Sequence, residues 1–164
     1  MYIGKRLETI RKAQKMSLTE LSEKSGVQLA TLSRIEHKKN ILNLVKGFAQ
    51  AHSKGLATHH LVLAGNPGHG AAEVAKIIQD ENLVGVVHML GYTPWDDVRV
   101  LLAEADAFVF VSQYEGFGFP VLEAYAAGVP ALVSKAGSLP EVAGDAAQMV
   151  NGTSPEDIAH GLVE

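Results

Sequence analysis

From residue 61 onward, short apolar runs alternate with stretches whose apolar residues recur at helical spacing. The short runs are bounded by glycine or polar residues, as buried strands are, and they cover residues 61–64, 84–90, 107–112, 129–133 and 147–150. Helical spacing covers residues 71–80, 96–105, a stretch ending near Ala127, a short segment at 139–142, and a last segment that begins at Pro155. Strands that alternate with helices predict an α/β fold with a mainly parallel sheet.

The first forty residues carry three short helical patterns in place of this alternation. Residues 3–15 have apolar side chains three or four positions apart, which is typical of an amphipathic helix. Ser17 and Glu20 form a capping box that opens a second helix, and Gly26 ends it. The third pattern covers residues 27–37 and contains leucine and alanine, which favour helix.

Helix, short helix, glycine turn and helix is the layout of a helix-turn-helix. Residues 3–39 resemble the lambda-repressor-like, Xre-type DNA-binding domain, and the segments that carry the resemblance are 3–7, 17–22, 26–27 and 31–36. In that family the second helix of the motif enters the major groove, so the resemblance implies DNA contacts by Gln28, Thr31 and Arg34. The family also has further helices, and here only residues 41–51 could supply one.

Charge is distributed unevenly along the chain, whose formal net charge is −4. Residues 1–46 hold ten Lys or Arg and four Glu, a balance of +6, whereas residues 47–164 hold four Lys or Arg and fourteen Asp or Glu, a balance of −10. A basic segment joined to an acidic one indicates two units with different partners. The basic segment could neutralise nucleic-acid phosphates, or it could be a solvated lysine-rich helix face, and both readings stay open.

The amino-acid composition excludes several kinds of functional site. The chain has no cysteine, which excludes disulfides, thiolate zinc sites and cysteine nucleophiles. Its longest apolar runs fall far short of the roughly 18 residues that a membrane-spanning helix needs. We expect a cytoplasmic protein, with no metal and no cofactor.

The most informative segment lies between residues 115 and 123, where Glu115 and Glu123 flank a loop with two glycines. An apolar strand pattern precedes the loop and a helical pattern follows it, which is how a parallel sheet builds a phosphate- or sugar-binding edge. Glycine lets backbone N–H groups approach a ligand, and the helix points its positive end at an anion. Two plainer readings remain: Glu115 as a solvated loop residue and Glu123 as a helix-start charge.

Residues 34–164 resemble the C-terminal, donor-binding half of GT-B glycosyltransferases of the large retaining group that includes sucrose synthase-like and mannosyltransferase enzymes. The segments that carry the resemblance are 34–41, 63–65, 90–92, 105–109, 115–123, 127–130 and 138–147. Their order and spacing together are far more specific than a single pair of glutamates. The resemblance implies a Rossmann-like parallel sheet and a nucleoside diphosphate sugar as the partner molecule.

The resemblance also implies a role for each site residue. Glu115, the catalytic residue of the set, would accept hydrogen bonds from hydroxyls of the donor sugar, and Glu123 would hold the ribose. Arg34 and Lys39 match the basic pair that neutralises the departing diphosphate. No dedicated metal is then required. Backbone near the sugar and diphosphate would come from the loop residues Gly116, Phe117, Gly118 and Phe119.

The two resemblances conflict over residues 27–33, which would be a recognition helix in one family and the first, central strand in the other. The helical composition and the upstream pattern favour the helix, which we predict here. A sheet without its central strand would leave buried backbone groups unpaired at about 1–3 kcal/mol each, so conversion of this segment to a strand is the alternative. The predicted organisation is a helix-turn-helix segment over 1–39 followed by a truncated GT-B C-terminal domain over 40–164.

Three functions follow from this organisation. The first is a nucleotide-sugar-binding glycosyltransferase domain, which transfers the sugar when complete but lacks its acceptor domain here. The alternative is a helix-turn-helix transcriptional regulator whose α/β unit senses a nucleotide or forms a homodimer. The third is an inert, marginally stable fusion of two unrelated sequences.

Overall fold

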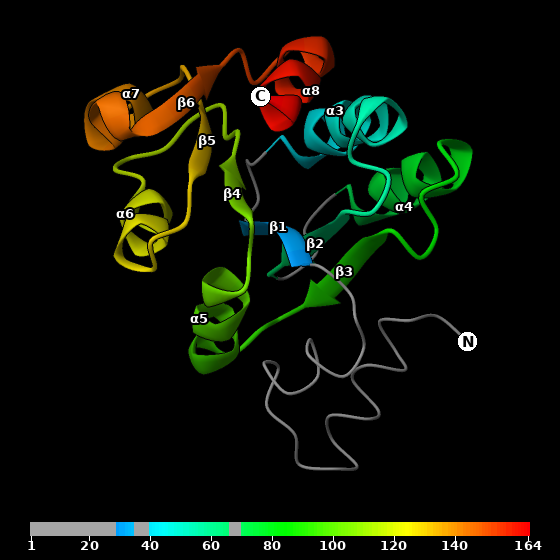
Figure 1. Ribbon diagram of the computed structural model, residues 1–164, viewed down its shortest axis with the longest axis horizontal. Coiled ribbons are helices and arrows are strands. Elements are labelled where there is room, and N and C mark those ends of the chain that lie inside the picture. The colour runs from blue at the N-terminus through cyan, green and yellow to red at the C-terminus, as the bar shows by residue number, and fades with distance from the viewer. Residues whose placement is uncertain (1–28, 35–39, 66–69) are drawn as a thin grey trace.

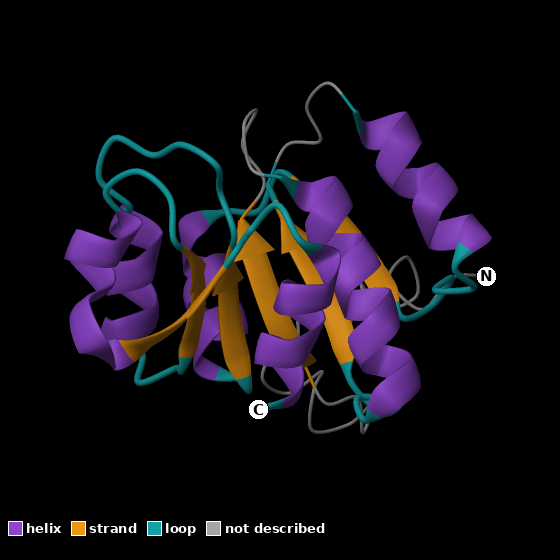
Figure 2. Cartoon of the chain, turned by 90° about the horizontal axis from the view of Figure 1, so that it is seen from above, coloured by secondary structure: helices purple, strands orange, loops and turns teal. Residues whose placement is uncertain are grey.

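The computed structural model describes residues 29–34, 40–65 and 70–164, the first of these ranges as backbone only. These residues form a six-stranded sheet with helices on both faces (Figures 1 and 2). No helix within the described ranges is both long and apolar enough to span a membrane.

All six strands of the sheet are parallel, in the order β3-β2-β1-β4-β5-β6 (Figure 1). Their bounds are β1 Leu29–Arg34, β2 His60–Ala64, β3 Val87–Gly91, β4 Ala107–Phe110, β5 Ala131–Ser134 and β6 Ala147–Val150. The predicted parallel α/β fold is therefore confirmed. The pattern placed the third strand too early, because Val84 makes only an isolated bridge to Val87.

Helices cover both faces of the sheet (Figure 2). Their bounds are α3 Ile41–Lys54, α4 Ala71–Asp80, α5 Trp95–Ala103, α6 Phe119–Ala126, α7 Leu139–Ala143 and α8 Pro155–Val163, with a 3-10 turn at Gly144–Ala146. Helices α3, α4 and α8 pack together on one face, whereas α5, α6 and α7 pack on the other. The last helix begins with a side-chain cap, in which the Ser154 hydroxyl accepts the N–H of Asp157 at 3.1 Å.

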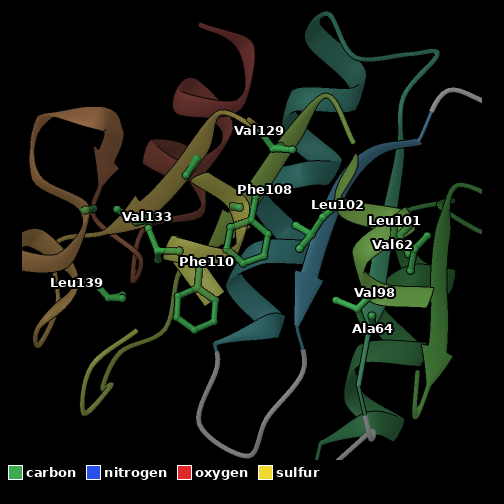
Figure 3. Packing of buried hydrophobic residues seen from close by; sticks show 14 residues of the cluster. Val62, Ala64, Val98, Leu101, Leu102, Phe108, Phe110, Val129, Val133 and Leu139 are labelled. Atoms are coloured by element: carbon green, nitrogen blue, oxygen red, sulfur yellow. The ribbon is translucent and has the colours of Figure 1, made fainter. Parts of the chain in front are cut away.

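Alternating side chains along each strand divide the core into two layers. Phe108 and Phe110 of β4 face α5, α6 and α7, and their rings stack with centroids 5.8 Å apart (Figure 3). Val109 and Val111, one position along, face α3, α4 and α8. Burial of each such side chain contributes about 1.5–3 kcal/mol. The continuous apolar runs in the sequence reflect strands that are covered on both sides.

The helix predicted over residues 27–33 is wrong where the structure describes them, because residues 29–34 form β1 in the middle of the sheet. Thr31 aligns with Leu61 of β2 on one side and with Ala107 of β4 on the other. The local composition suits a helix, but only a strand can pair the backbones of β2 and β4, so tertiary pairing overrides propensity. Thr31 and Arg34 accordingly lie on a strand and not on a recognition helix. Residues 1–28, including Gln28, lie outside the described residues.

Candidate functional site

The carboxyl ends of β1 and β4 form the natural place for a ligand. The chain runs outward from β1 to β2 and β3 on one side, and the later strands β4, β5 and β6 extend the sheet on the other. In open parallel sheets, ligands bind at the carboxyl ends of the strands at such a reversal of strand order. The loop after β4 covers residues 111–118, contains Glu115 of the segment predicted over 115–123, and starts at this point. We call it the glutamate loop.

Glu115 and Glu123 lie on different parts of the connection that follows β4. Glu115 is half-buried within the loop, and Glu123 is half-buried on α6, which begins at Phe119. Phe119 and Glu123 are four positions apart on this helix and therefore share a face. Arg34 is the last residue of β1, opposite Ala64 of β2, so its backbone lies at the same edge of the sheet. Lys39 falls outside the described residues.

The loop is held by the turn that precedes α7. The hydroxyl of Ser138 contacts two main-chain carbonyl oxygens, that of Phe117 at 2.9 Å and that of Glu115 at 3.2 Å. Gly137 has φ +55, and a Cβ there would lie 3.2 Å from the carbonyl oxygen of Glu115. Ser138 stands at the N-cap of α7 but makes no side-chain cap bond. Its hydroxyl fixes the backbone of the glutamate loop instead.

The two glycines of the loop serve different purposes. Gly118 has φ +101, and a Cβ there would lie 2.7 Å from Leu139 Cδ2, so both backbone conformation and packing require glycine. Gly116 has nothing within 4 Å of its Cβ position and is exposed. Packing within the described chain therefore gives no reason for glycine at 116. Close approach of a ligand to the backbone would give one.

Aromatic side chains surround the loop. Phe117 and Phe119 are 47% and 66% exposed, and their rings contact each other with centroids 4.7 Å apart and planes 39° apart. Tyr114 is also exposed. An exposed group of large apolar side chains is typical of a binding surface.

Histidines gather at the opposite edge of the sheet, at the amino ends of β2 and β3. His60 Nδ1 lies 2.9 Å from His88 Nε2, and the rings stack with centroids 5.1 Å apart. Burial, and then the neighbouring His60, lower the pKa of His88 to about 4. Burial likewise lowers the pKa of His60, assisted by His52. Within residues 29–34, 40–65 and 70–164, no group of three His, Asp or Glu is placed to hold a metal ion.

The structure connects two further residues to the loop. Asn40 and Ser138 both belong to segments that carried the GT-B resemblance, but neither was given a role. The Asn40 side chain bonds to Val111, 71 positions away, and the Ser138 hydroxyl to Glu115, 23 positions away. A polar residue just before a helix predicts a cap, so local pattern could not reveal these contacts.

Comparison with known proteins gives a consistent result. A family model described as glycosyl transferases group 1 matches residues 17–164. The chain is 35% identical over 127 residues to O-antigen chain mannosyltransferase B of Escherichia coli, covering 77% of this chain and 32% of that protein. It is 29% identical over 133 residues to N-acetyl-alpha-D-glucosaminyl L-malate synthase of Bacillus anthracis, covering 78% of this chain and 34% of that protein. The chain thus spans about a third of the length of these relatives.

Solved structures share the fold. Anabaena Alr3699/HepE, crystallised in complex with UDP and glucose, superposes with a TM-score of 0.76 at 23% identity, covering 89% of this chain and 41% of that chain. WaaG, a glycosyltransferase involved in lipopolysaccharide biosynthesis, superposes with a TM-score of 0.73 at 20% identity, covering 87% and 40% respectively. At these identities the likeness establishes the arrangement of helices and strands and nothing finer.

Proposed function

Because the chain belongs to the glycosyltransferase group 1 family, we propose that it binds the nucleotide-sugar donor of a retaining sugar transfer at the carboxyl edge of its sheet. The observation that carries the proposal is the fixed glutamate loop. Ser138 and Gly137 hold its backbone in place, while the Cβ position of Gly116 faces open space. A preorganised loop with exposed backbone suits a polar ligand, since the ligand need not order the loop when it binds.

Each loop residue has a role in this proposal. The carboxylate of Glu115 accepts hydrogen bonds from hydroxyls of the donor sugar. The backbone of Gly116, Phe117, Gly118 and Phe119 lies along the sugar and the diphosphate. Helix α6 begins at this point, so its positive end faces the diphosphate. Glu123 follows one turn later and accepts hydrogen bonds from the ribose hydroxyls.

Charge on the leaving group is the electrostatic problem in such a transfer. As the bond between sugar and diphosphate breaks, negative charge grows on the diphosphate oxygens. Arg34 and Lys39 are proposed to stabilise that charge, which lowers the barrier only if they contact the diphosphate in the transition state. The position of Arg34 at the carboxyl end of β1 supports this assignment.

The complete reaction needs an acceptor site, and this chain spans about a third of the relatives it matches. Transfer to an acceptor hydroxyl is therefore proposed for an assembly that includes an acceptor domain, because positioning and water exclusion require both sides of the site. The matched relatives include, by name, a mannosyltransferase and an N-acetyl-alpha-D-glucosaminyl L-malate synthase. The proposed donor class is a nucleoside diphosphate sugar, and the proposal does not specify which sugar or which base.

Titration calorimetry with UDP and with GDP tests the proposal on the 164-residue chain. We expect heat of binding with at least one nucleotide, and a loss of roughly tenfold or more in affinity in Glu123→Ala, since a hydrogen bond to a charged group contributes about 1.5–3 kcal/mol. Glu104→Ala is the matched control, because Glu104 is exposed at the end of α5, away from the loop. Absence of binding to either nucleotide by the folded wild-type chain would overturn the proposal.

DNA binding through residues 1–39 is the alternative function. A homodimer and a cytoplasmic location are proposed separately. The strand at 29–34 removes the recognition helix over those residues, so the alternative now depends on residues 1–28. A salt-dependent mobility shift with duplex DNA, lost in Gln28→Ala, would support it.

A further inference from the structure

Asn40 joins three separate parts of the carboxyl edge of the sheet. Its side-chain NH2 donates to the carbonyl oxygen of Val111 at 3.1 Å and to the carbonyl oxygen of Gly152. Its Oδ1 accepts from Asn43 Nδ2 at 2.7 Å and from Gln113 Nε2 at 3.2 Å. The amide therefore uses both of its donor hydrogens and both acceptor positions. A carbonyl oxygen can only accept a hydrogen bond, so the Asn40 NH2 group and not its Oδ1 must face Val111 and Gly152.

The backbone of Asn40 adds a second requirement. Its φ of 54 and ψ of 30 place it in the left-handed region, which asparagine and glycine adopt more readily than other residues. It stands at the N-cap of α3, yet its side chain makes no cap hydrogen bond. Glycine would satisfy the backbone and serine would serve as a cap, but neither could make the four amide contacts. The residue type is thus explained by the contacts across the sheet edge and not by helix capping.

Close packing leaves little freedom around these contacts. A Cβ on Gly152 would lie 2.9 Å from Ser134 Cβ and 3.0 Å from the carbonyl oxygen of Val111. The Ser134 hydroxyl in turn donates to the carbonyl oxygen of Ser112. Asn40 therefore bonds to a compact layer in which the ends of β4, β5 and β6 already touch. A shift of α3 relative to the loop would break several hydrogen bonds at once.

The contacts of Asn40 connect two parts of the proposed donor site. Lys39, the proposed diphosphate ligand, directly precedes it in the chain. Val111 and Gln113, two of its partners, lie four and two residues before Glu115. Ser138 holds the other side of the same loop through the carbonyls of Glu115 and Phe117. The loop is thus fixed from the α3 side by Asn40 and from the α7 side by Ser138.

We infer that Asn40 is a positioning residue that holds the start of α3 against the glutamate loop, so that diphosphate and sugar contacts meet on one donor molecule. The inference rests on the proposed function and adds to it a residue that does not itself touch the donor. A misplacement of about 1 Å at a reacting centre can cost on the order of a hundredfold in rate, and a loop that must be ordered when the ligand binds lowers the affinity.

Two matched variants measure the contribution of the Asn40 side-chain amide. Asn40→Gly removes the side chain while keeping a residue that adopts the left-handed backbone easily. Asn82→Gly is the control, since Asn82 has φ 56, is exposed, and lies after α4. We expect Asn40→Gly to weaken binding of UDP or GDP at least tenfold, measured well below the unfolding midpoint, with Asn82→Gly within about twofold of wild type. Gln113→Ala removes one exposed partner and should weaken binding by a smaller factor.

Hydrogen exchange of the peptide covering residues 111–118 supplies a readout that needs no ligand. It should exchange faster in Asn40→Gly than in wild type and Asn82→Gly. A merely structural role would lower the unfolding midpoint of Asn40→Gly while leaving nucleotide affinity unchanged, and that result would overturn the inference. If wild type binds neither nucleotide, the proposed function fails, and unchanged exchange in Asn40→Gly would then overturn the inference separately.

Discussion

The hydroxyl of Ser138 lies 2.9 Å from the carbonyl oxygen of Phe117, and this bond joins the turn before α7 to the loop after β4. The two residues are 21 positions apart in the chain. The contact fixes the backbone between Glu115 and the start of α6 without involving either glutamate side chain. It makes the shape of the loop a property of the folded domain and not of a bound ligand.

Replacing Ser138 should therefore affect both stability and binding. Ser138→Ala removes the hydroxyl that contacts the carbonyl oxygens of Glu115 and Phe117, and we expect a loss of about 1 kcal/mol in the free energy of unfolding. Nucleotide affinity should fall as well, because the loop must then be ordered on binding. Ser53→Ala is the control, since the exposed Ser53 hydroxyl donates at 2.8 Å to the carbonyl of Gln50 on the same helix. Urea unfolding and calorimetry on both variants check the expectation, and equal nucleotide affinity in both would contradict it.

Alanine should affect a different property at each of the two loop glycines. Gly118→Ala combines φ +101 with a Cβ only 2.7 Å from Leu139 Cδ2, and should lower the free energy of unfolding by about 1–3 kcal/mol. Gly116→Ala meets no atom within 4 Å and should change stability by less than about 0.5 kcal/mol. It should still reduce nucleotide affinity, because its methyl group occupies space proposed for the ligand. Full affinity in Gly116→Ala would place the ligand elsewhere.

Acid should destabilise the domain through the histidine pair. The pKa of His88 is about 4 in the folded chain, against an ordinary value of 6.5. Between these values the unfolded chain binds more protons than the folded one, so stability falls as the pH drops from about 6.5 to 4. The contribution of His88 to the free energy of unfolding is on the order of 3 kcal/mol, from 1.36 kcal/mol for each pKa unit. The lowered pKa of His60 acts in the same direction.

Urea unfolding at several pH values between 4 and 8 measures this dependence. His88→Gln should flatten the fall in stability below pH 6.5. His160→Gln is the control, because His160 is exposed on α8 beside Glu164. An unaltered slope in His88→Gln would show that the pair does not control the acid response.

Helices α3 and α8 should be sensitive to a single added methyl group. A Cβ on Gly47 would lie 2.7 Å from Ile158 Cγ2 and 2.9 Å from the carbonyl oxygen of Pro155. Alanine normally favours a helix over glycine by about 1 kcal/mol, but backbone on the facing helix cannot easily yield. We expect Gly47→Ala to lower the thermal midpoint, with Gly55→Ala as control, since its nearest contact would be 3.8 Å away. A raised midpoint in Gly47→Ala would mean that the two helices can separate at little cost.

The local pattern was sufficient to predict strands that are apolar on both faces and helices that are clearly amphipathic. The run at Phe108, Val109 and Phe110 predicted a buried strand, and the structure places those side chains alternately in the two layers of the core. The glutamate loop was likewise located correctly between β4 and α6, because strand, glycine-rich turn and helix each have a local signature. The roles assigned to Glu115 and Glu123 within it remain predictions.

Residues near one another in the chain were sufficient to predict the alternation of strands and helices from residue 61 onward and the segment that carries the candidate site. The order and spacing of several such segments were sufficient to predict the family. Residues 29–34 form a strand against their local pattern, because the backbones of β2 and β4 require a partner between them. The hydrogen bonds of the Asn40 and Ser138 side chains likewise depend on the tertiary structure. Both bond to a loop that is distant in the sequence, and no pattern of neighbouring residues encodes such a contact.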